Sequence, residues 1–144
     1  MNAAEQANSI EFASKIATIV GLFKAEFPDL RVDLKPWAND RETRDLVDPQ
    51  SIDIGFHFPG VSRRCCCRSL LVQMRLYEDP ETQQRKVIGL DMAGFDHRGK
   101  QWIFSTIDDW TFAGASAPDP TCGERLKRCC GQVLTIFNPP LMEE

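Results

Sequence analysis

The sequence predicts a single α+β domain in which one helix at each end packs on a mainly antiparallel sheet. Apolar side chains recur at helical spacing in residues 8–27 and 121–137, whereas residues 51–112 hold several runs of alternating apolar and polar side chains. A repeat of three or four residues is typical of helices, and a repeat of two is typical of strands. The expected order is an N-terminal helix, a short strand, a four-stranded antiparallel meander and a C-terminal helix packed on the sheet.

Size and composition indicate an ordinary globular chain. A length of 144 residues suits one domain, so residues 1–144 are expected to share one core. The net charge of −4 gives no general attraction to nucleic acid, although Arg63, Arg64 and Arg68 form a local basic cluster. No apolar stretch reaches the length of a membrane span, so we expect a cytoplasmic protein without nucleic-acid or membrane partners.

The N-terminal third predicts one helix and one short strand. Asn8 and Glu11 have the spacing of a helix-start pair, and Phe27-Pro28 ends the apolar stripe. Alternation over residues 30–35 predicts the strand, which Pro36 stops. The nearly all-polar residues 38–50 are expected to form a loop or, because Asn39 and Glu42 have capping-box spacing, one helical turn.

Four further strands are expected over residues 52–58, 66–78, 87–95 and 102–112. The connections at residues 59–60, 78–84 and 96–99 are short, which favours hairpins between successive strands. Strict alternation places Leu71 and Tyr77, and then Val87 and Phe95, on the face opposite the main apolar face. We expect Asp108 and Asp109 to bend or bulge the last strand.

The C-terminal helix is predicted after a loop over residues 113–120. Thr121 and Glu124 match a capping box, and Asn138 and Pro139 are expected to stop the helix. If both helices covered the same face of the sheet, the opposite face would be left partly exposed.

The six cysteines occur as a triplet, Cys65 to Cys67, and as Cys122, Cys129 and Cys130. This distribution differs from that of a secreted disulfide framework, so we expect reduced thiols. The triplet alternates across a strand and cannot converge on one ion. A metal or redox site that joins Cys65 and Cys67 to Cys122 and a second cysteine of the C-terminal helix is an alternative, and no cofactor is expected.

Two catalytic motifs are weighed. Residues 94–100 fit a phosphate-binding loop, but Gln101 replaces the magnesium-binding hydroxyl and a strand follows in place of a helix, which favours a hairpin turn. His57 and Cys67 could form a triad-like set with Asp91 or Asp53 only if the strand register joined them. An enzymatic role is therefore not the leading expectation.

Binding is the leading functional hypothesis. Leu71, Tyr77, Val87 and Phe95 are the candidate interface residues, for self-association as a homodimer or for a protein partner. The alternative is a small-molecule or enzymatic pocket on the concave side of the sheet, around His57. Its other polar residues would be Asp53, Asp91, Arg68 and Arg75. Trp37, Trp102 and Trp110 are candidates for core or binding residues.

Overall fold

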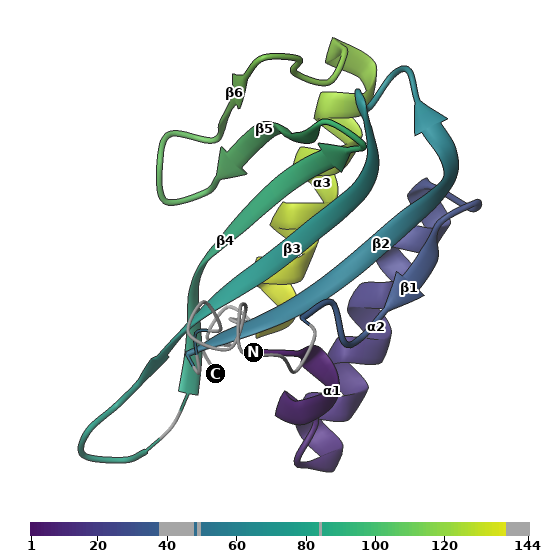
Figure 1. Cartoon of the computed structure of the whole chain (residues 1–144). Coiled ribbons are helices and arrows are strands. Elements are labelled where there is room, and N and C mark those ends of the chain that lie inside the picture. Colours follow the sequence, from purple (N-terminus) through teal and green to yellow (C-terminus); the bar gives the residue numbers. More distant parts are fainter. Residues whose placement is uncertain (38–47, 49, 84, 138–144) are drawn as a thin grey trace.

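The computed structural model describes residues 1–37, 48, 50–83 and 85–137 (Figure 1). Its helices and strands, in chain order, are α1 (Ala3–Gln6), α2 (Ile10–Glu26), β1 (Arg31–Asp33), β2 (Ser51–Ser62), β3 (Cys67–Glu78), β4 (Arg85–Asp96), β5 (Gly99–Ser105), β6 (Thr111–Gly114) and α3 (Pro120–Phe137). The strands form one antiparallel sheet in the order β1-β2-β3-β4-β5-β6. The predicted α+β class is confirmed.

The sheet has six strands, one more than predicted. Residues 102–112 were expected to form a single bulged strand, but the chain reverses after Ser105 and returns as β6. Asp109 and Trp110 both have positive φ in this reversal. Such left-handed backbone is typical of turns, so the segment divides into two strands. Most of the segment expected at residues 38–50 lies outside the described residues. The predicted helix stop at Asn138 lies wholly outside them.

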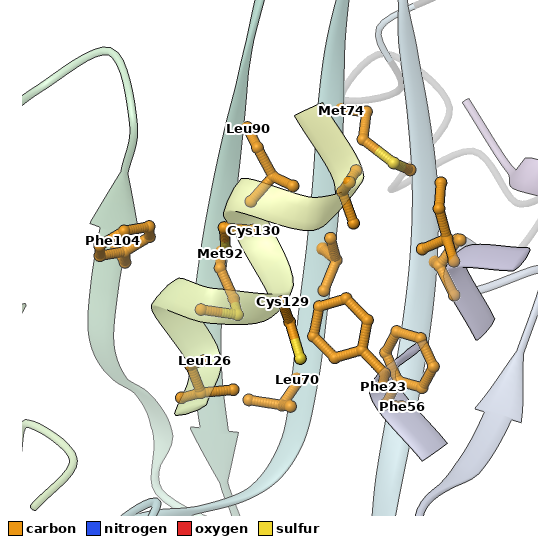
Figure 2. Packing of buried hydrophobic residues seen from close by; sticks show 14 of the residues in the cluster. Phe23, Phe56, Leu70, Met74, Leu90, Met92, Phe104, Leu126, Cys129 and Cys130 are labelled. Atoms are coloured by element: carbon orange, nitrogen blue, oxygen red, sulfur yellow. The ribbon is translucent and has the colours of Figure 1, made fainter. Parts of the chain in front are cut away.

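The two long helices, α2 and α3, lie on the same face of the sheet (Figure 1). Alternate residues of the strands point into this face, and the core includes Phe56 of β2, Leu70 of β3 and Met92 of β4 (Figure 2). Phe23 of α2 stacks on Phe56 with 4.7 Å between ring centroids, and Leu126 of α3 is fully buried. In the part of the chain that the structure describes, both long helices therefore cover one face of the sheet, and neither covers the other face, which we call the open face. None of the described helices is long and apolar enough to cross a membrane.

Both long helices begin at conventional caps, each at a position other than the one predicted. The Ser9 hydroxyl accepts a hydrogen bond from the Phe12 amide, so Ser9 rather than Asn8 caps α2. The Asp119 carboxylate accepts from the Cys122 amide, and Pro120 occupies the first position of α3. This Asp-Pro start replaces the predicted capping box at Thr121.

Two β-bulges change which face the flanking side chains occupy. Between Arg75↔Gly89 and Leu76↔Val87, β4 contains one extra residue, Ile88. A one-residue insertion moves the following side chains to the other face. Val87 is therefore a core residue, only 1% exposed, and its predicted interface position is wrong.

The second bulge lies in β5. Gly94 pairs with Trp102 and Phe95 pairs with Lys100, so Gln101 is the extra residue. Trp102 stays on the covered face, where it lies directly over Gly94. Lys100 is thereby placed opposite Phe95 on the open face.

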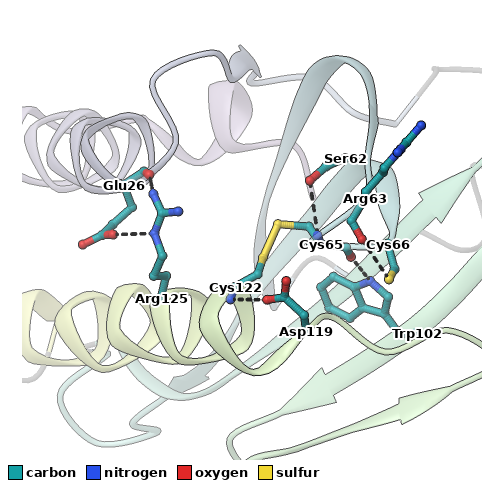
Figure 3. The surroundings of a disulfide bond; sticks show 9 residues. All are labelled: Glu26, Ser62, Arg63, Cys65, Cys66, Trp102, Asp119, Cys122 and Arg125. Atoms are coloured by element: carbon teal, nitrogen blue, oxygen red, sulfur yellow. Dashed lines mark hydrogen bonds and ion pairs between the residues drawn. A yellow bond between two sulfur atoms is a disulfide. The ribbon is translucent and has the colours of Figure 1, made fainter.

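The expectation of reduced thiols is wrong for one pair of cysteines. A disulfide joins Cys65, in the turn between β2 and β3, to Cys122 at the start of α3 (Figure 3). The indole of Trp102 donates a hydrogen bond of 2.8 Å to the Cys65 carbonyl. The first turn of α3 is thus tied to the end of the sheet, a contact between residues 57 apart in the chain.

Candidate functional site

The open face of the sheet carries two adjoining hollows, which together we call the groove. The His57 hollow has a volume of about 450 Å³, and the Asp91 hollow has a volume of about 310 Å³. Gln73, Ala93 and Lys100 line both. The groove therefore runs across the strands, from the segment after β1 to β6.

Apolar residues, most of them small, form the floor of the groove. The strand register places one residue from each of five neighbouring strands in a single row, namely Gly55, Leu71, Ala93, Ile103 and Ala113. Side chains directly opposite in a sheet are neighbours, so the row is continuous. Three of its five members are glycine or alanine, which leaves space above the sheet.

A row of polar groups borders this floor in the His57 hollow. The His57 Nδ1 atom lies 2.8 Å from the Ser69 hydroxyl on the paired strand, and its Nε2 atom lies 3.6 Å from an Asp33 carboxylate oxygen. The His57 side chain is 33% exposed. The imidazole is therefore held between two partners and faces the hollow.

The three side chains of this row, Asp33, His57 and Ser69, are of the residue types found in a hydrolase triad. Their surroundings favour ligand binding over catalysis. Ser69 lies within β3, which is paired with β2 on one side and β4 on the other. Main-chain N–H groups in this part of the sheet form the ladder between the strands. Hydrolases place main-chain or side-chain N–H donors around the reacting oxygen, and these donors supply much of the rate. Ser69 is paired with His57 on one side and with Phe95 on the other, so its main chain belongs to the ladder and the exposed polar groups of the row can hydrogen-bond a ligand.

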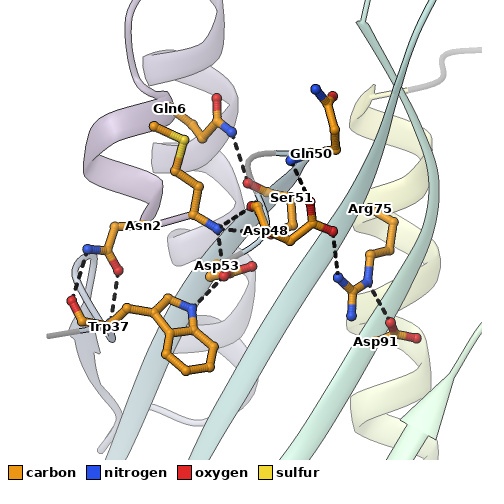
Figure 4. A network of polar contacts seen from close by, with 10 residues as sticks. Asn2, Gln6, Trp37, Asp48, Gln50, Ser51, Asp53, Arg75 and Asp91 are labelled. Atoms are coloured by element: carbon orange, nitrogen blue, oxygen red, sulfur yellow. Dashed lines mark hydrogen bonds and ion pairs between the residues drawn. The ribbon is translucent and has the colours of Figure 1, made fainter. Parts of the chain in front are cut away.

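Trp37 forms the wall of the His57 hollow next to β1, and polar contacts fix its position (Figure 4). Its backbone exchanges two hydrogen bonds with the Asn2 side chain, of 2.9 and 3.1 Å. Its indole N–H donates to a carboxylate oxygen of Asp53 at 2.5 Å. The same oxygen lies 2.8 Å from the amino group of Met1. The indole is therefore preorganised beside the hollow.

An ion-pair network forms the wall of the Asp91 hollow. The Arg75 guanidinium lies 2.7 Å from Asp91 and 3.3 Å from Asp48 (Figure 4). Arg75 is thus neutralised by two carboxylates. Lys100, by contrast, lies over the Phe95 ring with 5.8 Å to the centroid, and no carboxylate among the described residues lies within 4.0 Å of its ammonium.

The predicted pocket residues are only partly brought together. His57 lines one hollow, and Asp91 and Arg75 line the other. Asp53 is fully buried behind Trp37, and Arg68 is exposed near the β2–β3 turn and lines neither hollow.

The predicted interface residues also separate. Leu71 and Phe95 line the His57 hollow, whereas Tyr77 lies outside it on the β3–β4 hairpin, 51% exposed. Sequence reasoning did not select Asp33, Ser69, Gln73, Ala93 or Lys100. Strand alternation could have indicated Ser69 and Gln73, but Lys100 reaches the face only through the bulge at Gln101.

The cysteines offer no metal centre within the described residues. No group of three or more His, Cys, Asp or Glu side chains there is arranged to hold an ion. Burial raises the pKa of Cys67 to about 12 and that of Cys129 to about 11, and it also raises the pKa of Cys130. These three thiols are therefore protonated at neutral pH and act as small core side chains.

The fold and the groove define an α+β domain with one helix-covered and one open sheet face. The chain belongs to a family described as a domain of unknown function, whose family model matches residues 4–139. Comparison with curated proteins and with solved structures finds no match.

Proposed function

We propose that this chain is a non-catalytic binding domain whose open sheet face takes a small molecule in the groove. The single observation that carries the proposal is the groove itself, which crosses the face that α2 and α3 leave uncovered. A sheet face with such an apolar floor gains stability when a ligand covers it.

The size and lining of the His57 hollow support a small ligand. Sites for small molecules usually have volumes of about 300–1,000 Å³, mainly apolar walls and a few converging polar groups. Here the apolar part is Trp37, Leu71 and Phe95, and the polar groups include His57 and Ser69. Because Trp37 is already fixed by hydrogen bonds, little side-chain freedom is lost when a ligand packs against it.

A protein partner on the same face is the second candidate. It is supported by exposed apolar side chains in the groove and along the β3–β4 hairpin, including Ile103 at 49% and Ile88 at 60% exposure. A symmetric homodimer would need a self-complementary surface. Two hollows facing each other do not provide one, so a partner that inserts a side chain fits the surface better than a second copy.

The proposed site is independent of the cellular compartment. A cytoplasmic location remains our proposal, and cellular reductants there would favour free thiols at Cys65 and Cys122. The disulfide lies among core residues beneath the helix-covered face, whereas the groove lies on the opposite face. The groove should therefore be present in both redox states.

A fragment screen by ¹⁵N NMR tests the proposal without assuming a ligand. Fragments should perturb the amides of Leu71, Gln73, Ala93 and Phe95 as one contiguous set. The variant Ala93→Leu should abolish these shifts because it fills the floor of the groove, whereas Ala17→Leu, on an exposed side of α2, should leave them intact.

Fragment shifts that map to the helices, or that survive Ala93→Leu, would contradict the small-molecule proposal. Sedimentation velocity distinguishes the small-molecule proposal from self-association, because it reports whether the chain forms a dimer. A dimer that Leu71→Glu dissociates without unfolding would favour self-association on this face over a ligand site.

A further inference from the structure

The groove combines an apolar floor with the basic side chain of Lys100, which has no carboxylate within 4.0 Å among the described residues. We infer that it takes an amphipathic monocarboxylate, with Lys100 as the counter-ion and the apolar body of the ligand in the His57 hollow. This inference rests on the proposed function and adds the chemical class of the ligand.

The His57 hollow provides the surface for the apolar body. Its floor is Gly55, Leu71 and Ala93, and Trp37 and Phe95 stand at its sides. A glycine at position 55 also lets Pro36 approach, since an added Cβ would lie 3.3 Å from the Pro36 Cβ. The hollow therefore depends on small residues that keep the floor low between two aromatic side chains.

The charges around the groove favour an anionic head group beside Lys100. Arg75 is already paired with Asp91 and Asp48, and Asp33 lies near His57. Lys100 lines both hollows, and no carboxylate in the described part of the chain lies within ion-pair distance of it. A carboxylate placed there would gain a counter-ion without displacing an existing pair.

The same charges give the ligand an orientation. In the Asp91 hollow, Arg75 is already paired with Asp91, and Asp108 adds a second carboxylate to the lining, so an anionic group placed deep in it would find no free counter-ion. The His57 hollow offers more apolar surface. The head group therefore belongs at the junction of the two hollows, and the apolar body extends toward Trp37.

The bulge in β5 is an independent observation that supports this assignment. Regular alternation from Trp102 would place Gln101, not Lys100, opposite Phe95 on the open face. The extra residue instead brings the ammonium over the Phe95 ring, where the two hollows adjoin. Bulges often re-aim a side chain next to a functional site, and this one delivers the cation.

The test compares decanoate with 1-decanol, which share an apolar chain and differ in charge. Both are titrated into the oxidised 144-residue chain and followed through the amide shifts of Leu71 and Ala93. Decanoate should bind about fivefold more tightly, as expected for one partly exposed ion pair. High salt should reduce this preference.

The variant Lys100→Gln should remove the preference, so that decanoate and decanol bind with similar affinities. Lys86→Gln is the matched control, because Lys86 is an exposed strand lysine outside both hollows. Equal binding of the two probes, or a preference that survives Lys100→Gln, would overturn the inference while leaving the groove as a binding site. Binding of neither probe would also overturn it, and the fragment screen would then decide the proposed function separately.

Discussion

The carboxylate of Asp53 shows how one buried residue supports the proposed site from behind. Its side chain is fully buried and accepts the Trp37 indole N–H. Asp53→Ala should lower the free energy of unfolding by about 1–3 kcal/mol, because partner groups are left without their acceptor. Urea unfolding measures this change, with Asp29→Ala at an exposed position as the control. Equal midpoints for the two variants would show that Asp53 is not needed to fix Trp37.

The reactivity of each free thiol should depend on its exposure and its pKa. Cys66 is partly exposed, whereas Cys67, Cys129 and Cys130 are buried and have raised pKa values. The oxidised native protein should therefore react rapidly with a disulfide reagent at about one thiol, because thiolate and access are both required. The variant Cys66→Ala should lose this fast phase. A fast phase that persists in Cys66→Ala would mean that a core thiol is accessible.

At the scale of elements, the packing of β5 on β4 depends on Gly94. An added Cβ at this position would lie 2.3 Å from the Trp102 ring, which is itself tied to the Cys65 carbonyl. Gly94→Ala should cost about 1–3 kcal/mol, as is typical of overpacking in a core. Gly60→Ala is the matched control, since nothing lies within 4 Å of its added Cβ. Comparable thermal midpoints for the two variants would contradict this account.

The contact between α2 and α3 should be sensitive to acid. Hydrogen bonding by Arg125, aided by the charge of Arg128, lowers the pKa of Glu26 below its ordinary value. A carboxylate with a lowered folded pKa stabilises the fold above its unfolded pKa and loses this effect as the pH falls through the folded pKa.

The expected result is that the stability difference between wild type and Glu26→Gln, present at pH 6, shrinks as the pH approaches 3. Urea midpoints measured across this range test it, with Glu5→Gln as an exposed control. A difference that stays constant with pH would assign the effect to packing rather than to charge.

The sequence predicts this fold well where apolar and polar side chains alternate regularly along a strand, and poorly where a bulge interrupts the alternation. Uninterrupted alternation in residues 70–76 placed Leu71 correctly on the face opposite the core, and helical spacing located α2 and α3. Alternation failed at Val87 and could not reveal Lys100, because one extra residue in a strand reverses the faces and leaves no local signal. The pairing of Asp33, His57 and Ser69 depends on register among three strands, which one sequence does not specify.

At the scale of the whole molecule, the arrangement separates stability from binding. The helices, the core and the disulfide occupy one side of the sheet, and the groove occupies the other. Substitutions on the open face can therefore alter a ligand site while most of the core remains intact. This separation explains why variants such as Lys100→Gln are suitable probes of binding.

The disulfide provides the test of this separation. Linking residues 57 apart should stabilise the fold by about 4 kcal/mol, because the cross-link restricts the unfolded chain. A reductant should therefore lower the urea midpoint of the wild type. It should not change that of the double variant Cys65→Ala, Cys122→Ala.

Amide chemical shifts around Leu71 and Ala93 should stay the same after reduction, since the groove lies across the sheet from the disulfide. Large shift changes there would show that the cross-link also shapes the groove. Binding would then depend on redox state, contrary to the separation of the two faces.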